Sequence, residues 1–189
     1  MEKPNNYDTT TAASFGDFET LEPGGYICQI LKAEATQSKS GKEMLILYFD
    51  IREGEHKGYF KRTFDRMKEK NPDAKWKGTY YQLTTGNSTQ YFKGMITAIE
   101  ESNRGFKFDF DETKLDGKMF GGAIGLEQYE NNGKTGMSPK LKFTVSVESV
   151  KKGITAPKDK MLEGIKKDDS LDDLAGFSLM ADDESDVPF

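Results

Sequence analysis

The sequence has few of the residue types from which many active sites and extracellular folds are built. Its 189 residues include one cysteine, Cys28, and one histidine, His56. A lone cysteine cannot form an intrachain disulfide, and one cysteine with one histidine cannot make a multi-cysteine zinc site. These absences exclude disulfide-rich domains and zinc modules, and they indicate a reducing compartment.

Long hydrophobic runs are also missing. The longest apolar stretch, 44–49, is far shorter than the ~20 residues that a membrane-spanning helix needs. The first residues, MEKPNNYDTT, lack the basic start and apolar run of a signal peptide. We therefore expect a cytoplasmic protein without a membrane partner.

Motifs of enzymes are absent as well. The sequence has no P-loop, no GxSxG and no HExxH pattern. One acidic group could hold Mg²⁺ for phosphodiester cleavage: Asp109, Asp111, Glu112 and Asp116. These residues lie between a helix and a strand, where Asp is favoured for its hydrogen bonds to the turn backbone. We expect no enzyme, no metal and no cofactor, and keep a metal-dependent nuclease as a distant alternative.

Charge is divided unevenly along the chain. The formal net charge is -5, from 27 basic and 32 acidic residues. Eight of the acidic residues, and no Lys or Arg, lie from Asp168 onward, so residues 1–167 hold 27 basic and 24 acidic residues and carry +3. A mildly basic body therefore precedes an acidic tail.

Hydrophobic periodicity predicts a mainly β protein. Phe92, Met95, Ile96 and Ile99 share one face of a helix over residues 88–103. Strands are expected over 26–35, 44–53, 59–70, 114–130 and 141–150, although neither face of 59–70 is cleanly apolar. This order predicts a five-stranded OB-like barrel with one helix between strands 3 and 4. A generic five-stranded α+β sandwich would give almost the same pattern.

The composition also divides the chain into three parts. We expect a flexible N-terminal arm over 1–20, the OB-like domain over 21–153, and a linker with a disordered acidic tail over 154–189. The stretches 71–86 and 131–140 are expected to be irregular, the second as a flexible loop.

A basic and aromatic segment is the strongest functional signal. The segment from Lys61 to Lys77 contains seven basic and three acidic residues, interleaved with aromatic rings. Single-stranded nucleic acid offers phosphates and base faces, so a surface that combines cations with rings suits it without sequence readout. The candidate DNA-binding residues are Phe60, Lys61, Arg62, Phe64, Arg66, Lys68, Lys75, Trp76, Lys77, Tyr80, Tyr81, Lys134 and Lys140.

Many aromatic residues must instead fill the core. We expect packing roles for Tyr48, Phe49, Phe92, Phe120 and Phe143. Phe60 and Phe64 suit the core and a stacking role equally, whereas Trp76, Tyr80 and Tyr81 lie among charges and are expected to be exposed.

The chain ends in DDESDVPF, in which acidic residues precede an aromatic ring and a free carboxylate. Such an end can act as a hook that its acidic charges steer to a basic pocket. It resembles the C-terminal tip of bacterial and phage single-stranded DNA-binding proteins. The resemblance implies an OB fold and the recruitment of replication or recombination proteins, such as a helicase, primase, polymerase, nuclease or recombinase. The residues concerned are Asp182, Asp183, Glu184, Asp186, Val187, Pro188 and Phe189.

The body resembles small phage early proteins that are suspected single-strand binders. The shared stretches are PGGY, SGKEMLILYFDI, GEHKGYF and LDGKMFGG. Val187 stands where Ile is more usual, the linker is short, and the body does not resemble the tetramer-forming domain of the bacterial proteins. A homo-oligomer of another kind stays open.

Together these observations predict a sequence-nonspecific single-stranded DNA-binding protein of phage type that protects strands during replication or recombination. The main alternative is a phage regulatory protein that binds a host protein and whose acidic tail mimics DNA. Binding to an oligonucleotide distinguishes the two.

Overall fold

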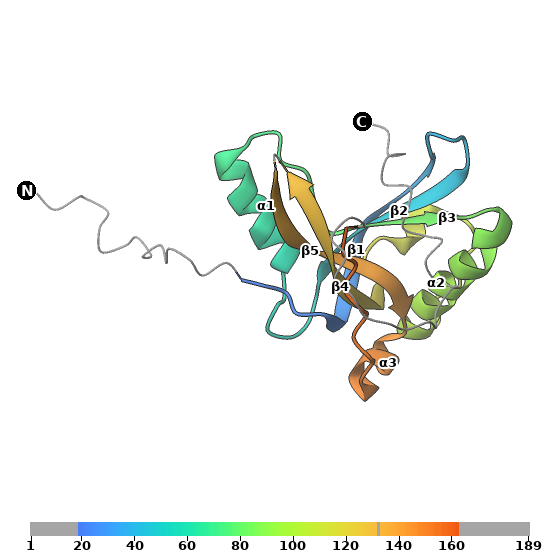
Figure 1. Ribbon diagram of the computed structural model, residues 1–189. Helices are drawn as coiled ribbons and strands as arrows, with labels where there is room; N and C mark the ends of the chain where they lie inside the picture. The colour runs from blue at the N-terminus through green and yellow to red at the C-terminus, as the bar shows by residue number, and fades with distance from the viewer. Residues whose placement is uncertain (1–18, 132, 163–189) are drawn as a thin grey trace, which may run out of the picture.

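The computed structural model describes residues 19–131 and 133–162. Within these residues the predicted arm (1–20) is represented only by its last two positions, and most of the acidic tail lies outside. Eight strands and α-helices follow one another along this part of the chain (Figure 1). They are β1 (Gly24–Gln37), β2 (Glu43–Ile51), α1 (Tyr59–Lys70), β3 (Thr79–Leu83), α2 (Thr89–Ser102), β4 (Met119–Asn131), β5 (Lys134–Val145) and α3 (Val147–Lys152).

The strands form one antiparallel sheet in the order β3-β2-β1-β4-β5. Its two edge strands, β3 and β5, approach each other without a hydrogen-bonded ladder, so the sheet curls without closing. With α2 between β3 and β4, this is the arrangement of a five-stranded, partly open barrel. The predicted mainly β fold with five strands and a helix between the third and fourth is confirmed; the barrel is not closed.

The first strand belongs to both halves of the curled sheet. Residues 24–29 of β1 pair with β4, and residues 28–37 pair with β2. The register shifts between Ile30 and Lys32, which leaves Leu31 as an extra residue in β1. A bulge of this kind bends a strand and increases its twist. It therefore allows β1 to turn from one partner strand to the other.

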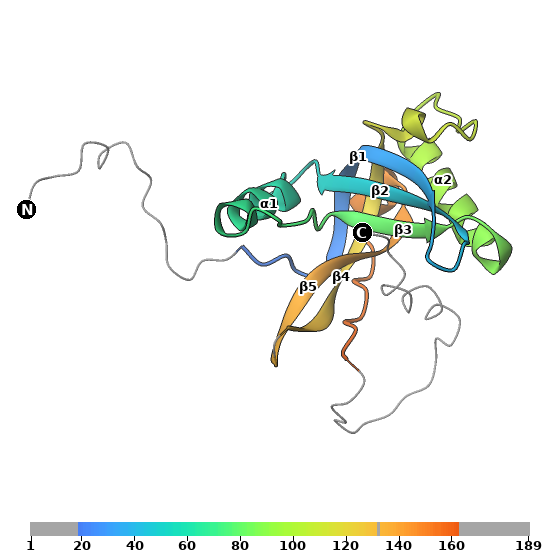
Figure 2. The ribbon, with the colours of Figure 1, turned by 90° about the horizontal axis from the view of Figure 1, so that it is seen from above.

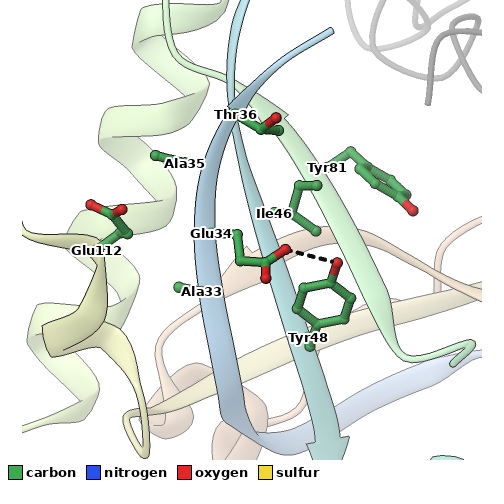
Figure 3. Close-up of a pocket in the computed structure, with 8 residues that line it drawn as sticks. All are labelled: Ala33, Glu34, Ala35, Thr36, Ile46, Tyr48, Tyr81 and Glu112. Atoms are coloured by element: carbon green, nitrogen blue, oxygen red, sulfur yellow. Dashed lines mark hydrogen bonds between the residues drawn. The ribbon is translucent and has the colours of Figure 1, made fainter. Parts of the chain in front are cut away.

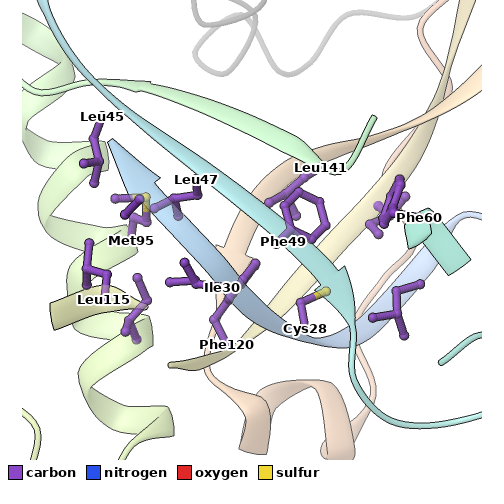
Figure 4. Close-up of a cluster of buried hydrophobic side chains, with 14 of the residues drawn as sticks. Cys28, Ile30, Leu45, Leu47, Phe49, Phe60, Met95, Leu115, Phe120 and Leu141 are labelled. Atoms are coloured by element: carbon purple, nitrogen blue, oxygen red, sulfur yellow. The ribbon is translucent and has the colours of Figure 1, made fainter. Parts of the chain in front are cut away.

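The core fills the concave side of this sheet (Figure 4). Alternate residues of β2, namely Leu45, Leu47 and Phe49, point inward and meet Met95 and Ile99 from α2. Phe120 is fully buried, and its ring centroid lies 5.7 Å from that of Phe49 in an edge-to-face contact. Phe49 and Phe120 confirm their expected packing roles.

The third strand lies elsewhere than predicted. Residues 59–70 form helix α1, and the strand is β3, within the stretch expected to be irregular. The helix buries Tyr59 and Phe60 and leaves its charged residues outside. Its N-cap, Gly58, makes no side-chain cap; the carboxylate of Asp50 in β2 instead accepts hydrogen bonds from the N–H groups of Phe60 and Lys61, at 3.0 and 3.1 Å.

The end of the fold also differs from the prediction. The β4–β5 ladder continues to the pair Asn131 and Lys134, so most of the expected loop 131–140 is a hairpin. The expected strand 141–150 ends at Val145, where the Ser146 hydroxyl caps α3 by accepting from the Ser149 N–H at 3.3 Å. Beyond α3, Lys160 forms a parallel bridge with Glu127 of β4, so the ordered fold extends past the expected boundary at 153.

Among the described residues, no helix is long and apolar enough to cross a membrane.

Candidate nucleic-acid interface

The face of β1, β2 and β3 that points away from the core carries two tyrosine rings. The register places Ile46 opposite Tyr81, and Tyr48 opposite Thr79. Because side chains alternate along a strand, Tyr48, Ile46 and Tyr81 share the outer face, while Leu45, Leu47 and Tyr80 point inward. Figure 3 shows Tyr48, Ile46 and Tyr81 along this face.

A shallow pocket of about 420 Å³ lies at this face and wraps around β1. Tyr81 is 37% exposed, Tyr48 is half-buried and Ile46 is buried. Tyrosine rings above an apolar floor can stack with bases of any identity. In a five-stranded OB-type barrel the face of strands 2 and 3 is where oligonucleotides bind.

A short polar network fixes the Tyr48 ring. The Tyr48 hydroxyl donates a hydrogen bond to Glu34 Oε2 at 3.1 Å, and Lys32 donates to the other oxygen of the same carboxylate. Burial first, and then the Glu34 carboxylate, raises the pKa of Tyr48 to about 12, so its hydroxyl stays protonated. The hydrogen bonds from Lys32 and Tyr48 lower the pKa of Glu34. Lys32 thereby offsets the negative charge of Glu34.

Basic residues lie at both ends of the sheet. In Figures 1 and 2, α1 and the tip of the β4–β5 hairpin lie at one end, and the β1–β2 turn and α2 lie at the other. The β1–β2 turn carries the exposed Lys39 and Lys42, and the loop before β3 carries the exposed Lys75 and Lys77. A strand that crosses the outer face would meet cations where it arrives and where it leaves.

The β4–β5 hairpin carries a further exposed ring. Tyr129 lies opposite Gly136, and a Cβ atom on Gly136 would lie 2.8 Å from the ring carbon Cζ of Tyr129. Glycine at this position therefore lets the ring lie against the backbone of β5, and Tyr129 remains 49% exposed. By alternation, Tyr129 shares a face of the hairpin with Lys140, one of the predicted DNA-binding residues.

The predicted residues of α1 have different surroundings in the structure. Phe60 is 1% exposed and packs on Phe49, so no base can reach it; of its two predicted roles the core role is confirmed. Lys61 pairs with Asp65 at 2.9 Å, and Arg62 pairs with Glu19 at 2.8 Å. Arg66 and Lys68 lie further along the helix.

Trp76 and Phe64 pack together at the junction of α1 and β3. Their rings are in edge-to-face contact with centroids 5.5 Å apart, and the Lys68 ammonium lies 5.5 Å from the Phe64 centroid. The Trp76 indole donates to the backbone oxygens of Gly78 at 3.0 Å and Phe49 at 3.3 Å. The ring is half-buried against the core rather than exposed, so its first role is structural.

The two adjacent tyrosines of β3 separate by strand alternation. Tyr80 packs against the core, and burial raises its pKa to about 12. The expectation that Tyr80 is exposed is wrong, whereas the expected exposure of Tyr81 is confirmed. Of the other predicted residues, Lys134 begins β5, Lys140 lies further along it, and the tail residues from Asp182 to Phe189 lie outside the described residues.

Two rings of the candidate surface, Tyr48 and Tyr129, were not among the binding residues predicted from the sequence. Tyr48 was expected in the core because β2 is apolar on both faces, which hides the alternation that separates inner from outer residues. Tyr129 stands at the end of an expected strand, and its register with Gly136 shows how its ring lies against β5. The signal that could have identified Tyr129 is an aromatic residue opposite a glycine in a hairpin.

The acidic group considered for Mg²⁺ serves local structure. Asp111 accepts a hydrogen bond from the Thr113 N–H at 3.2 Å, and Asp109 pairs with Lys114. Asp116 Oδ1 accepts a hydrogen bond from the Ala33 N–H of β1 at 2.9 Å, so its partner differs from those of Asp109 and Asp111. Within 19–131 and 133–162, no three His, Cys, Asp or Glu side chains are grouped so that they could hold a metal ion.

Comparison with protein families gives a match over part of the chain. A family model described as a protein of unknown function, DUF669, matches residues 6–89, a stretch that contains β1, β2, α1 and β3. No curated protein matches the sequence.

Proposed function

We propose that this protein binds single-stranded DNA without sequence preference, across the outer face of β1, β2 and β3. The observation that carries the proposal is the placing of Tyr48 and Tyr81 over Ile46 on that face, away from the core. A ring on a sheet can stack with any base, because every base has a π-face.

The form of the surface supports single strands over duplex. Stacking requires bases that are unpaired and accessible, whereas a duplex presents mainly its phosphate backbone to a shallow sheet face. The cations at the two ends, including Lys42 and Lys77, suit phosphates that enter and leave the face. The β4–β5 hairpin, with Tyr129 and Lys140, would extend the contact beyond the sheet.

The tail contributes a second part of the proposal, from sequence alone. Its resemblance to the tips of single-stranded DNA-binding proteins supports the recruitment of replication or recombination proteins to coated DNA, in a phage setting. This part does not depend on the geometry of the sheet. The alternative, a regulatory protein that binds only a host protein, predicts no affinity for an oligonucleotide.

Replacement of Tyr81 by alanine tests the proposed face. The ring is largely outside the core, so Tyr81→Ala should leave the unfolding midpoint nearly unchanged while weakening oligo-thymidine binding by ~1–3 kcal/mol, roughly five- to 150-fold. Met137→Ala is the matched control, because Met137 is an apolar residue of similar exposure that lies in β5, outside β1, β2 and β3. Equal affinity of the Tyr81 and Met137 variants, both folded, would remove this face from the account.

A further inference from the structure

A second surface lies along the edge of β1, at the end of the sheet that carries α2. Beyond the bulge, residues 32–37 of β1 pair with β2 on one side only. Within the described ranges 19–131 and 133–162, no strand pairs with the other side of this segment. The turn Glu112–Leu115 contacts β1, and Asp116 takes the N–H of Ala33. Beyond Ala33 this edge has no neighbouring strand among the described residues, so a further strand could pair there.

The direction of the backbone groups shows which residues form this edge. The N–H of Ala33 points away from β2, because it donates to Asp116 Oδ1 at 2.9 Å. The register with β2 is regular from Lys32 to Gln37, and backbone groups alternate in direction along a strand. The N–H and C=O groups of Ala35 and Gln37 thus point out from the edge as well, and both residues are exposed.

An apolar pocket of about 560 Å³ adjoins this edge. It is lined by Ala35 and Gln37 of β1, Met44 of β2, Phe92 of α2 and Phe110 of the connection to β4. A chain that paired with the edge could place an apolar side chain into this pocket. Main-chain pairing with a sheet edge, combined with side-chain pockets, is a recurring mode of peptide recognition.

Phe110 combines a rare backbone conformation with an exposed aromatic ring. Its φ angle is 66°, in the left-handed region that a phenylalanine rarely adopts, and 82% of the residue is exposed. The ring centroid lies 5.5 Å from that of Phe108, which in turn lies 6.4 Å from that of Phe92. An unfavourable backbone conformation that holds an apolar ring in water indicates a binding role.

The charges at the pocket define the partner. Glu43 and Glu112 both line it, and in the described part of the chain neither carboxylate takes part in an ion pair. Figure 3 shows Glu112 beside Ala33 and Ala35, on the side of β1 away from Tyr81. These carboxylates repel phosphates and the acidic C-terminal residues of this chain, and they attract Lys or Arg.

We propose that the β1 edge and its pocket bind an extended segment of a partner protein that carries a bulky apolar side chain flanked by basic residues. The segment adds to the sheet beside Ala35 and Gln37 and places its apolar side chain against Phe110. The two pockets adjoin at Ala35, Thr36 and Glu112, whereas Tyr81 lines only the first and Phe110 only the second. The proposal does not rest on DNA binding, because Tyr81 and Phe110 can be replaced one at a time.

Nuclear magnetic resonance of the full-length protein with a synthetic peptide tests this site. The probe is acetyl-Lys-Val-Phe-Thr-Lys-amide, and the comparison peptide has Glu in place of both Lys. We expect the largest amide shifts at Ala35 and Gln37, and about tenfold weaker binding of the acidic peptide. The absence of shifts at these amides with millimolar basic peptide, or equal binding of both peptides, would overturn the proposal.

Phe110→Gly gives a variant that removes the ring without straining the fold. Glycine accepts a φ of 66° readily, so the melting temperature should be unchanged or higher. Affinity for the basic peptide should fall about tenfold, whereas affinity for oligo-thymidine should not change. Tyr81→Ala is the reciprocal control and should keep peptide binding. If Phe110→Gly instead lost oligonucleotide binding and kept the peptide, the pocket would belong to a DNA path and the proposal would be wrong.

Discussion

The carboxylate of Asp50 lies at the start of a helix that begins eight residues after the end of its own strand, and it accepts a hydrogen bond from the Phe60 N–H at 3.0 Å. Its second oxygen accepts from the Lys61 N–H at 3.1 Å, and the first also accepts from the Ile51 N–H at 2.8 Å. Asp50 is buried and so holds three backbone groups that would otherwise lack partners. One side chain of β2 thereby fixes both the start of α1 and its position against the sheet.

Removal of this carboxylate should loosen α1. We expect Asp50→Ala to lower the free energy of unfolding by ~1–3 kcal/mol, because helix N–H groups are left without acceptors in a buried place. Denaturant titration followed by circular dichroism measures the loss. Asp65→Ala is the control: it breaks the exposed pair with Lys61 and should cost at most ~0.5 kcal/mol. Similar losses in the two variants would contradict the capping role.

The contact of Asp50 with α1 also explains why the third strand was predicted at the wrong place. Residues 59–70 contain both a strand-like alternation and a helical spacing of Tyr59, Phe60, Thr63, Phe64 and Met67. The helical spacing could be recognised in the sequence and would have predicted α1. The capping group could not be recognised there, because it comes from a neighbouring strand and no local rule connects Asp50 with Phe60. Once α1 occupies this segment, the short stretch 79–83 provides the third strand.

The close packing around Gly78 gives a second test. A Cβ atom at this residue would lie 2.2 Å from the Phe49 backbone oxygen and 2.8 Å from the Trp76 indole nitrogen. Gly78→Ala should therefore lower stability by ~1–3 kcal/mol or more, because backbone must move. Gly94 of α2 has no atom within 4 Å of the same position, so Gly94→Ala should raise stability by ~0.5–1 kcal/mol. Thermal unfolding of both variants gives opposite signs if the packing is as described.

The candidate site could be predicted only in part from the sequence, because the predicted secondary structure of its segment was wrong. The ring-rich segment 76–81 was recognised, but the inner and outer rings could not be separated before β3 was known to be a strand. Alternation then places Tyr80 inside and Tyr81 outside. Trp76 was expected in solvent because lysines flank it, yet its indole N–H reaches the backbone of Gly78 and Phe49. Charged neighbours in sequence do not exclude burial of a ring whose N–H finds an acceptor.

The interactions of Glu19 with Arg62 and His56 predict that stability depends on pH. Burial raises the pKa of Glu19, but hydrogen bonds with Arg62 and His56 outweigh it, and the net pKa lies below the ordinary value of 4.5. A lowered carboxyl pKa stabilises the fold above pH 4.5, and this contribution is lost as the pH falls through the lower folded value. Glu19→Gln should thus lower the melting temperature at neutral pH, and the difference from the wild type should shrink toward about pH 3. A difference that stays constant with pH would contradict the ion-pair role.

Cys28 provides a reporter of global unfolding. The residue is fully buried, and burial, followed by the charge of Asp50, raises the pKa of its thiol well above the ordinary value. Because the thiolate is the reactive form, labelling with a disulfide reagent should be very slow in native buffer and rapid in denaturant. Rapid labelling of the native protein would show that the core around β1 opens locally.

Fluorescence anisotropy of a labelled oligo-thymidine strand, titrated with the full-length protein at low and at physiological salt, tests the central claim most directly. The account predicts binding that weakens as salt rises, because phosphate contacts release counterions, and that is much poorer for a duplex of the same length. No binding to the single strand at either salt by a folded protein, or equal binding to the duplex, would contradict it.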